Sequence, residues 1–302
     1  MKDSHATDHS ARPLDPLAAT IVVALCLSWG LNQVAIKLTL PDIPPLIQAT
    51  VRSFGALVVV VLWCVARRVP LLKRDGTLIP GAIAGILFGL EFVLIYRGIN
   101  LSMASRASIF LYTAPFFVAL GGTFFIPGER LGPWQWLGLT LSFAGTAVAI
   151  GVPQAAVDAR MLTGDLMLIG GGAAWAATTL VIKGSRLRLI APEKTLAYQL
   201  LVSAPILGVG AWALGEGIVA APRPAALWWL AYQTVWIVGV TYGVWFALVK
   251  HYSASRLSAF TFLTPLFGVV GAHVLLGDPI DWPFALAAAL VVAGLVLVNR
   301  PR

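Results

Sequence analysis

Long apolar segments recur along the chain and are separated by short polar segments. The hydrocarbon core of a bilayer is about 30 Å thick, so a helix that crosses it needs ~20 mostly apolar residues. Ten segments have this character, at 17–38, 45–66, 78–97, 104–125, 131–150, 162–183, 194–214, 225–247, 256–276 and 282–299. The first is longer than the ~7–15 apolar residues of a secretion signal, so we interpret it as a permanent helix. The pattern predicts an all-α, polytopic membrane protein with ten transmembrane helices.

The composition supports this prediction, because the 302 residues are 59% hydrophobic and only 11% charged. The mean hydropathy of +0.86 is also far from that of a soluble surface with ordinary charge density. The net charge of +8 has a topological explanation. With the tail at 1–16 in the cytoplasm, fifteen of the 21 Lys and Arg residues lie on the cytoplasmic side and five on the other. The positive-inside rule then predicts that both termini lie in the cytoplasm, and the excess of positive charge requires no role in nucleic-acid binding.

An internal repeat relates the two halves of the chain. A shift of 150 residues places nine residues of positions 89–121 on identical residues. A shift of 146 residues places Trp29 on Trp175 and Lys37 on Lys183. Each half contains five predicted helices, and this odd number means that the second copy enters the membrane from the opposite side.

We therefore expect an N-terminal tail at 1–16, a first five-helix repeat at 17–150 and a second, inverted repeat at 151–302. The two repeats are expected to surround a central cavity. Inverted repeats are common in transporters that work by alternating access, because the halves can exchange conformations and expose one cavity to either side.

Short motifs occupy corresponding places in the two halves. They are Trp29-Gly30 in the first helix, the Ala-Ser-Arg-x-Ser…Pro runs at 104–115 and 254–265, and Gly128-Glu129 with its counterpart Gly277-Asp278. Together with the inverted helices, they resemble the EamA-type branch of the drug/metabolite transporter superfamily over essentially the whole chain after residue 16. Within that branch the chain is most similar to bacterial exporters of aromatic and other amino acids.

The resemblance implies a secondary transporter with a central cavity lined mainly by helices 1, 3, 4, 6, 8 and 9. It implies export of small metabolites, most of all amino acids, although relatives with the same motifs carry drugs or other metabolites. The expected partners are the small-molecule substrate and the lipid bilayer. No cofactor is expected, and one chain is expected to act as a monomer.

Two helices share a polar face. Trp29, Asn32 and Gln33 lie on one side of helix 1, and Trp175, Thr178 and Thr179 have the same spacing in helix 6. Polar side chains at membrane depth need water or a protein partner. This face therefore either lines the cavity and binds substrate or forms hydrogen bonds between helices.

Helix 3 carries Glu91, the one acidic residue that falls well inside a predicted span. Arg52 in helix 2 is predicted at a similar depth, so Glu91 either pairs with Arg52 or binds a substrate ammonium group or a proton. Gly81, Gly85 and Gly89 of helix 3 recur every four residues and predict close packing on a neighbouring helix.

Pro115 and Pro265 fall midway along helices 4 and 9, where each removes a backbone donor and predicts a kink. We expect these kinks either to act as gates beside the cavity or simply to serve packing. In the first case Tyr112, Thr113 and Thr264 border the central space. Further along, helix 8 is rich in aromatic residues, and its deeper members Trp236 and Tyr242 are candidates for an aromatic wall. They complete the following set of predicted substrate-binding residues: Trp29, Asn32, Gln33, Glu91, Tyr112, Thr113, Trp175, Thr178, Thr179, Trp236, Tyr242 and Thr264.

An intramembrane enzyme is the main alternative from another class. It would need a nucleophile with a base, paired carboxylates or metal ligands at membrane depth, and the predicted helices hold one deep acid. Cys26 and Cys64 both fall inside predicted helices, so they suggest no metal site and no disulfide framework. A phosphate-binding G-x-x-x-x-G-K-[ST] loop is absent from the sequence, which argues against transport driven directly by ATP.

Overall fold

Every regular element of the computed structural model is helical among the residues that the structure describes, which are 14–102, 110–150, 158–277, 280 and 282–300. The helices are α1 (Pro16–Thr39), α2 (Pro45–Ala66), α3 (Leu78–Leu101), α5 (Ala114–Phe125), α6 (Pro133–Ile150), α7 (Ala159–Gly184), α8 (Pro192–Ala213), α9 (Pro224–Ala231), α10 (Tyr242–His251), α11 (Ala254–Phe260), α12 (Leu263–Leu276) and α13 (Pro283–Asn299). A short 3-10 helix η1 (Arg186–Leu189) follows α7, and a π-helix η2 (Tyr232–Thr241) joins α9 to α10. The predicted all-α fold is confirmed.

Seven helical segments of the described chain are long and apolar enough to cross a membrane. They are Pro16–Thr39, Pro45–Ala66, Leu78–Ile99, Ala159–Gly184, Pro192–Ala213, Pro224–His251 and Ala254–Leu276. α5 and α13 are shorter apolar helices. Large apolar side chains such as Phe54, Phe124 and Trp212 are exposed on the outside of the bundle, as expected where lipid is the solvent.

The helix boundaries follow from local sequence signals. Asp15 and Asp158 act as N-caps, and their carboxylates accept hydrogen bonds from the backbone N–H groups of Ala18 and Met161 at 2.8 and 2.7 Å. α1, α2, α5, α8, α9 and α13 each carry proline in the first turn, where its missing N–H costs no helical hydrogen bond. These signals fix where each span begins, so they also set the depth of the polar side chains along it.

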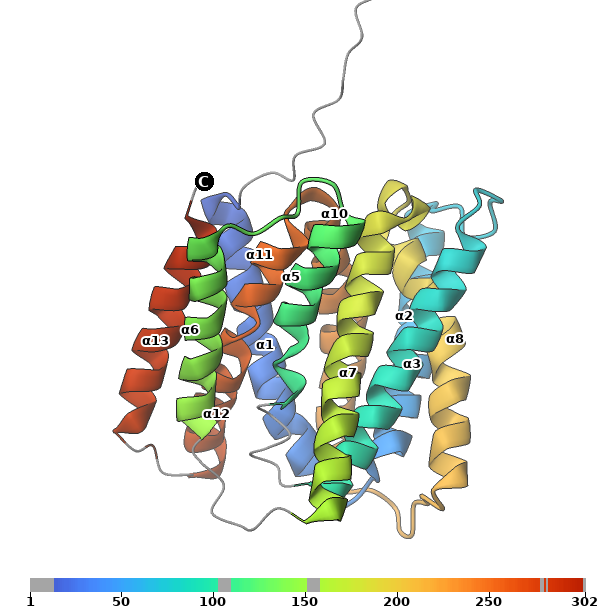
Figure 1. Ribbon diagram of the computed structural model, residues 1–302. Helices are drawn as coiled ribbons and strands as arrows, with labels where there is room; N and C mark the ends of the chain where they lie inside the picture. Colours follow the sequence, from blue (N-terminus) through green and yellow to red (C-terminus); the bar gives the residue numbers. More distant parts are fainter. Residues whose placement is uncertain (1–13, 103–109, 151–157, 278–279, 281, 301–302) are drawn as a thin grey trace, which may run out of the picture.

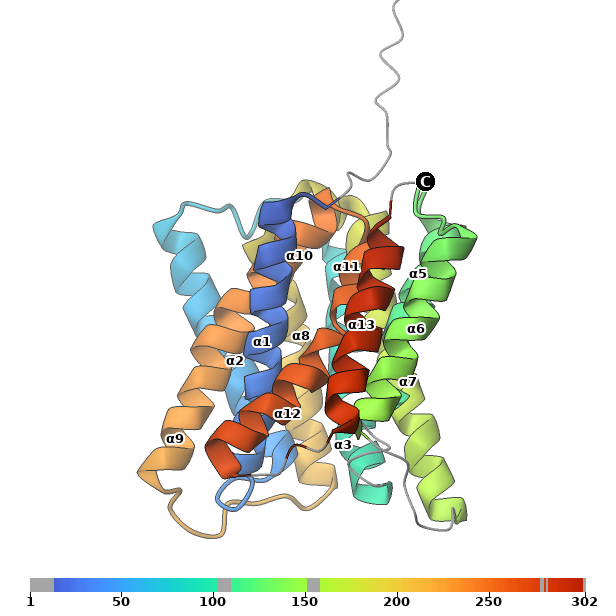
Figure 2. The same cartoon turned by 90° about the vertical axis from the view of Figure 1, so that its left-hand side faces the viewer.

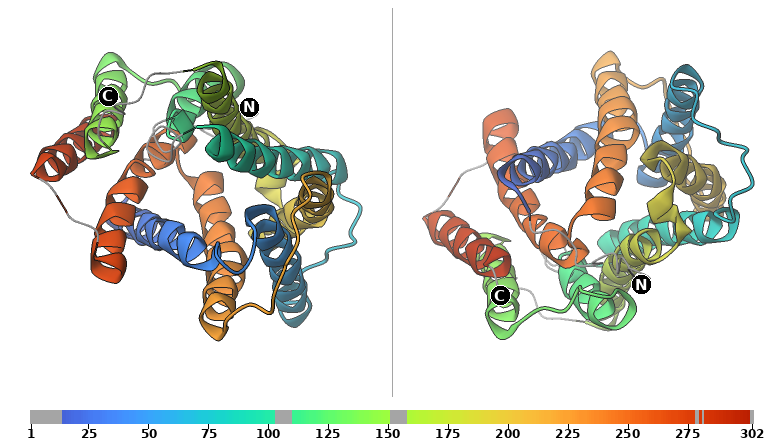
Figure 3. Two further views of the ribbon diagram at one scale, coloured as in Figure 1. Left: turned by 90° about the horizontal axis from the view of Figure 1, so that it is seen from below. Right: turned by 90° about the horizontal axis from the view of Figure 1, so that it is seen from above.

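α1 begins and α13 ends on the same side of the bundle, at the top of Figure 1. We call this side the terminal face and the other side the opposite face. Four helix pairs form the main contacts, namely α6 with α13, α3 with α7, α2 with α8 and α1 with α12. Figure 2 shows α12 crossing α1, and Figure 3 shows the α6–α13 pair at one edge of the molecule.

The three glycines of α3 form a tight contact with α8. A Cβ atom added to Gly81, Gly85 or Gly89 would lie 2.6, 2.5 or 3.0 Å from the side chains of Tyr198, Val202 and Ile206, respectively. The two backbones approach closely only because these positions lack a side chain. The packing role predicted for this glycine row is confirmed, and it fixes which side of α3 turns to the interior.

The predicted proline kinks are breaks between separate helices. α11 ends at Phe260 and α12 begins at Leu263, so Pro265 stands in the first turn of a new helix. Pro115 likewise stands in the first turn of α5, after a turn at Tyr112 and Thr113. The Ala-Ser-Arg-x-Ser run at 104–108 lies outside the described residues. Tight turns bridge both breaks, because the carbonyls of Phe110, Ser258 and Ala259 accept hydrogen bonds from the N–H groups of residues three positions later at 3.1–3.2 Å.

Candidate functional site

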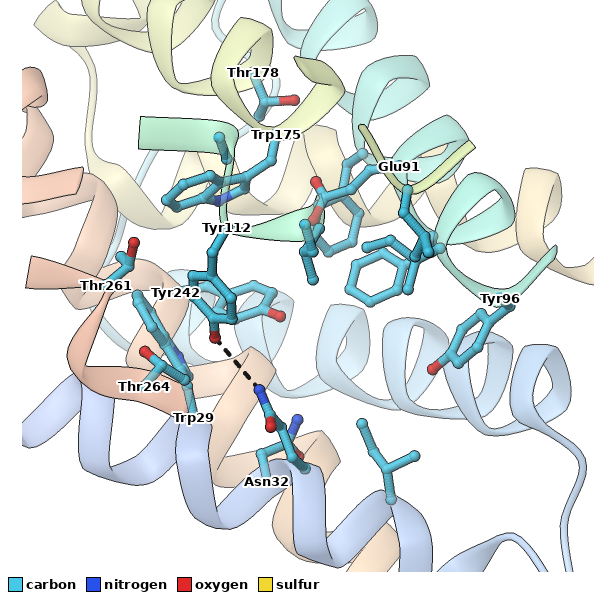
Figure 4. Close-up of a pocket in the computed structure, with 18 of the residues that line it drawn as sticks. Trp29, Asn32, Glu91, Tyr96, Tyr112, Trp175, Thr178, Tyr242, Thr261 and Thr264 are labelled. Atoms are coloured by element: carbon cyan, nitrogen blue, oxygen red, sulfur yellow. Dashed lines mark hydrogen bonds between the residues drawn. The ribbon is translucent and has the colours of Figure 1, made fainter. Parts of the chain in front are cut away.

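A cavity of about 460 Å³ lies inside the bundle and draws its lining from α1, α3, α5, α7, α8, α10 and α12 and from the proline-associated breaks. This volume falls within the range of about 300–1,000 Å³ that is typical of small-molecule sites. Trp29 and Trp175 lie along its middle (Figure 4). Towards the opposite face the lining reaches Leu40 and Ile99, whose side chains are 41% and 40% exposed. The cavity therefore runs from the middle of the bundle to a solvent-accessible end.

α3 contributes one continuous stripe of the lining. Phe88, Glu91, Phe92, Ile95, Tyr96 and Ile99 all border the cavity. Their spacing of three and four residues places them on one helical face, next to the glycine row that packs on α8. Glu91 thus stands in the interior near Phe88 and Phe92, whose ring centroids are 4.9 Å apart, and its carboxylate points to the cavity (Figure 4).

Aromatic rings form an unbroken series along the cavity wall. Trp175 stacks on Trp245 with ring centroids 5.9 Å apart, and Trp245 meets Trp29 at 5.4 Å. Trp29 then meets Tyr242 at 6.3 Å, and Tyr242 meets Phe88 at 5.8 Å. Residues from the four helices α1, α3, α7 and α10 therefore build one aromatic surface suited to planar, apolar or cationic groups.

The structure brings ten of the predicted substrate-binding residues to this cavity. They are Trp29, Asn32, Gln33, Glu91, Tyr112, Trp175, Thr178, Thr179, Tyr242 and Thr264. Gln33 Nε2 donates a hydrogen bond of 3.3 Å to the Tyr112 hydroxyl across the cavity (Figure 4). The hydroxyls of Thr178 and Thr179 donate to the carbonyls of Ala174 and Trp175 on their own helix. The role of these residues in binding remains a prediction.

Two of the predicted residues, Thr113 and Trp236, are not part of the lining. Thr113 donates its hydroxyl to the Phe110 carbonyl at 2.6 Å, and the turn between helices directs it towards Gly172 of α7. Trp236 is 46% exposed, and its indole N–H donates to Ser28 Oγ. It lies within the π-helix η2, whose turns are wider than α-helical ones, and its depth along the helix did not fix the direction of its ring. The gating candidates Pro115 and Pro265 are buried beside the cavity and are not part of its lining either.

Arg52 does not form the predicted ion pair with Glu91 in the described part of the structure. Its guanidinium carbon lies 4.2 Å from the centroid of the Phe92 ring, and its Nε and Nη2 atoms have no hydrogen-bond partner. Glu91 Oε2 also lacks a partner. Phe92 thus stands between the buried cation and the cavity, and Glu91 is left available on the cavity side.

A buried cluster closes the bundle at the terminal face. The Glu129 carboxylate accepts hydrogen bonds from the Ser253 hydroxyl at 2.7 Å and from the backbone N–H groups of Ala254 and Ser255 at 2.8 and 3.3 Å. Lys183 Nζ lies 3.4 Å from Glu129 Oε1 and also donates to the Tyr252 carbonyl. A carboxylate at a helix N-terminus is favourable because it satisfies unpaired N–H groups and complements the helix dipole. This terminal-face cluster joins the segment after α5 to the end of α7 and the start of α11.

Several residues of the cavity and its closure were not among the predicted substrate-binding residues. Trp245, Phe246 and Gln199 line the cavity although their helices gave no distinct polar face. Glu129 was noted only as part of a motif, and its long-range partners could not be read from local spacing. The signal that could have found Trp245 is its place three residues after Tyr242 on the same helix.

The helical bundle with a central cavity defines a polytopic membrane protein that can enclose a small molecule. The EamA-like transporter family model matches residues 16–151 and 162–300. The chain therefore belongs to the EamA-like transporter family, as its motifs predicted, and it is a membrane transporter of that family.

Relatives from several bacteria extend this finding. The chain is 29% identical to a Salmonella typhimurium protein named probable amino-acid metabolite efflux pump, over 94% of each chain. It is 26% identical to the uncharacterized transporter YvbV of Bacillus subtilis, over 93% of this chain and 91% of the relative. A solved crystal structure with 20% sequence identity matches with a TM-score of 0.80 and covers 92% of this chain and 96% of that one. This last likeness supports the fold alone.

Proposed function

We propose that this protein is a secondary transporter of the inner membrane that exports small metabolites, most of all aromatic and other amino acids, by alternating access. The observation that carries the proposal is a cavity that is rich in aromatic residues, opens towards one face and is sealed at the other. The amino-acid assignment is supported by relatives named probable amino-acid metabolite efflux pump in Salmonella typhimurium and Escherichia coli, at 29% and 28% identity.

Two inverted five-helix repeats at 17–150 and 151–302 belong to this proposal, as does a cytoplasmic position for the N-terminal tail at 1–16. The helix contacts support the repeats. α1 packs on α12, and α7, which corresponds to α1, packs on α5, which corresponds to α12. α2 packs on η2, and its counterpart α8 packs on α3. Corresponding helices thus make corresponding contacts in the two halves.

The two faces differ in a way that supports alternating access. Lys37 and Lys183 occupy matching positions in the two repeats. Lys183 is 9% exposed within the terminal-face cluster, whereas Lys37 lines the open end of the cavity. We interpret this conformation as outward-open, with the terminal face in the cytoplasm. In the other half of the cycle the terminal-face cluster separates and the cavity opens inwards.

The test is a counterflow screen with the purified full-length chain in proteoliposomes. Liposomes preloaded with a panel of unlabelled amino acids should take up the matching radiolabelled amino acid transiently above equilibrium. Asn32→Ala protein that is correctly folded is expected to show weaker counterflow for all amino acids, because it loses a polar contact on the cavity wall. Absence of counterflow with every amino acid, together with counterflow for a drug or another metabolite, would reassign the substrate.

A further inference from the structure

We propose that the cavity selects ligands through a primary ammonium group held beside the aromatic wall, so that aromatic amines without a carboxylate are ligands as well as amino acids. This inference rests on the proposed function, because it takes the cavity to be the transport site. It goes further by naming the recognised group and by adding a second class of ligand.

Four side chains of the lining carry a buried oxygen atom that has no hydrogen-bond partner. These atoms are Glu91 Oε2, Asn32 Oδ1, Gln199 Oε1 and Thr264 Oγ1. Each of the four residues is more than nine-tenths buried. A buried oxygen without a partner is unfavourable, so a ligand that brings N–H donors to this lining forms hydrogen bonds that the protein's own groups do not supply.

Two donors of the same wall are already engaged. Trp29 Nε1 donates to Thr241 Oγ1 at 2.9 Å, and Gln33 Nε2 donates to the Tyr112 hydroxyl. A ligand carboxylate would have to displace these bonds to gain a partner from either group. A ligand ammonium can bind the four oxygen atoms without breaking an existing hydrogen bond, since these atoms have no protein partner.

The charges of the described lining favour a cation at mid-depth. Its charged side chains are Glu91, near the middle of α3, and Lys37, at the end near the opposite face. The guanidinium of Arg52 offsets part of the Glu91 charge, but it lies against Phe92 and is not part of the lining. An ammonium group at mid-depth therefore touches the carboxylate and the electron-rich faces of Phe88 and Tyr242, which attract cations.

The experiment compares three ligands that differ in one group each, namely L-phenylalanine, 2-phenylethylamine and 3-phenylpropionate. Binding is measured by calorimetry on purified full-length protein in nanodiscs, where passive permeation of the amine has no effect. We expect 2-phenylethylamine to bind within about threefold of L-phenylalanine. We expect 3-phenylpropionate to bind at least about tenfold more weakly, because it lacks the donors that hydrogen-bond to a charged acceptor.

Two variant proteins test whether Glu91 is the group that binds the ammonium. Glu91→Gln should weaken binding of the amine and of the amino acid by about tenfold or more. Glu193→Gln is the matched control, because Glu193 lies in the first turn of α8 outside the cavity, and its ligand affinities should equal those of the parent. If Glu91→Gln lowers the yield of folded protein, the comparison of the three ligands on the parent protein still tests the ammonium inference.

Each outcome of the series distinguishes the two proposals. Equal binding of 3-phenylpropionate and 2-phenylethylamine overturns the ammonium inference. Binding of L-phenylalanine without binding of the amine also overturns it, while the proposed amino-acid export stands. Binding of the amine without binding of L-phenylalanine supports the ammonium site and counts against aromatic amino-acid export. If none of the three binds, both proposals fail for aromatic ligands.

Discussion

The terminal-face cluster gives the sharpest test of alternating access, through the single substitution Glu129→Gln. Glu129 is 2% exposed and holds Ser253, Ala254 and Ser255 at the start of α11 while it pairs with Lys183. The substitution keeps the shape of the side chain but removes its charge. It also turns an amide NH₂ group towards backbone N–H donors, so at least one of them loses its acceptor.

These contacts determine how far the substitution shifts the equilibrium between the closed and the open terminal face. A hydrogen bond to a charged group contributes about 1.5–3 kcal/mol, and loss of one partner of a buried ion pair costs about 3–5 kcal/mol. If these contacts form only while the terminal face is closed, a loss of ~3 kcal/mol shifts the equilibrium towards the open state by roughly a hundredfold. A population that is rare in the parent protein then becomes readily detectable.

The assay is one-sided labelling of a cysteine at Thr179, which lines the cavity one helical turn before Lys183. The native Cys26 and Cys64, both buried, are first replaced by serine. An impermeant maleimide applied from the terminal face should label Thr179→Cys slowly in the parent and at least about tenfold faster with Glu129→Gln. Unchanged labelling from the terminal face in folded Glu129→Gln protein would refute the proposal that this cluster closes the cavity.

Three further predictions address topology, the aromatic wall and helix packing. Reporter fusions at Arg188 should report the cytoplasm and fusions at Arg223 the exterior, and an exterior signal at Arg188 would overturn the charge-based topology. Trp29→Ala or Trp175→Ala should weaken amino-acid binding about threefold to tenfold, since an aromatic contact contributes about 0.5–1.5 kcal/mol. Folded Trp variants with parental affinity would remove this wall from the site. Gly85→Val should destabilise the protein by about 1–3 kcal/mol, measured as a lower Tm, and an unchanged Tm would contradict the tight α3–α8 contact.

Much of the cavity could be predicted from the sequence where the chain is a regular α-helix. The faces of α1 and α7 follow the 3.6-residue period, so Trp29, Asn32 and Gln33 reach the cavity as predicted. The glycine row of α3 also marked its packing side correctly and left Glu91 facing inwards. Periodicity is informative here because every turn of these helices has the same geometry.

The predictions failed where local geometry departs from the α-helix or where a partner is distant in the chain. Trp236 was chosen for its depth in the predicted span, but depth does not give the direction of a side chain, and this residue lies in a π-helix. The depth of Arg52 was predicted to match that of Glu91, but equal depth does not fix the direction of a long side chain, and the guanidinium packs on Phe92. Glu129 binds residues more than 100 positions away, and no short-range pattern encodes such a contact.

A disulfide across the same closure tests whether the terminal face must open during transport. A Cβ atom added to Gly122 of α5 would lie 3.1 Å from Ser255 Oγ of α11. In a disulfide the Cβ atom of one cysteine lies about 3 Å from the Sγ atom of the other, so the pair Gly122→Cys and Ser255→Cys is placed to form a bond between α5 and α11. The bond would hold the terminal face closed and leave the other end of the cavity unchanged.

The oxidised double variant is therefore expected to bind its amino acid with parental affinity but to catalyse no counterflow, and a reductant should restore transport. Each single cysteine variant, treated with the same oxidant, controls for the substitutions themselves. Binding and transport separate in this way only if the ligand enters from one face and leaves by the other, because a protein that is merely damaged loses both. Counterflow at the parental rate in fully cross-linked protein would show that substrate passes without separation of α5 from α11, and the rearrangement of the two halves would have to be abandoned.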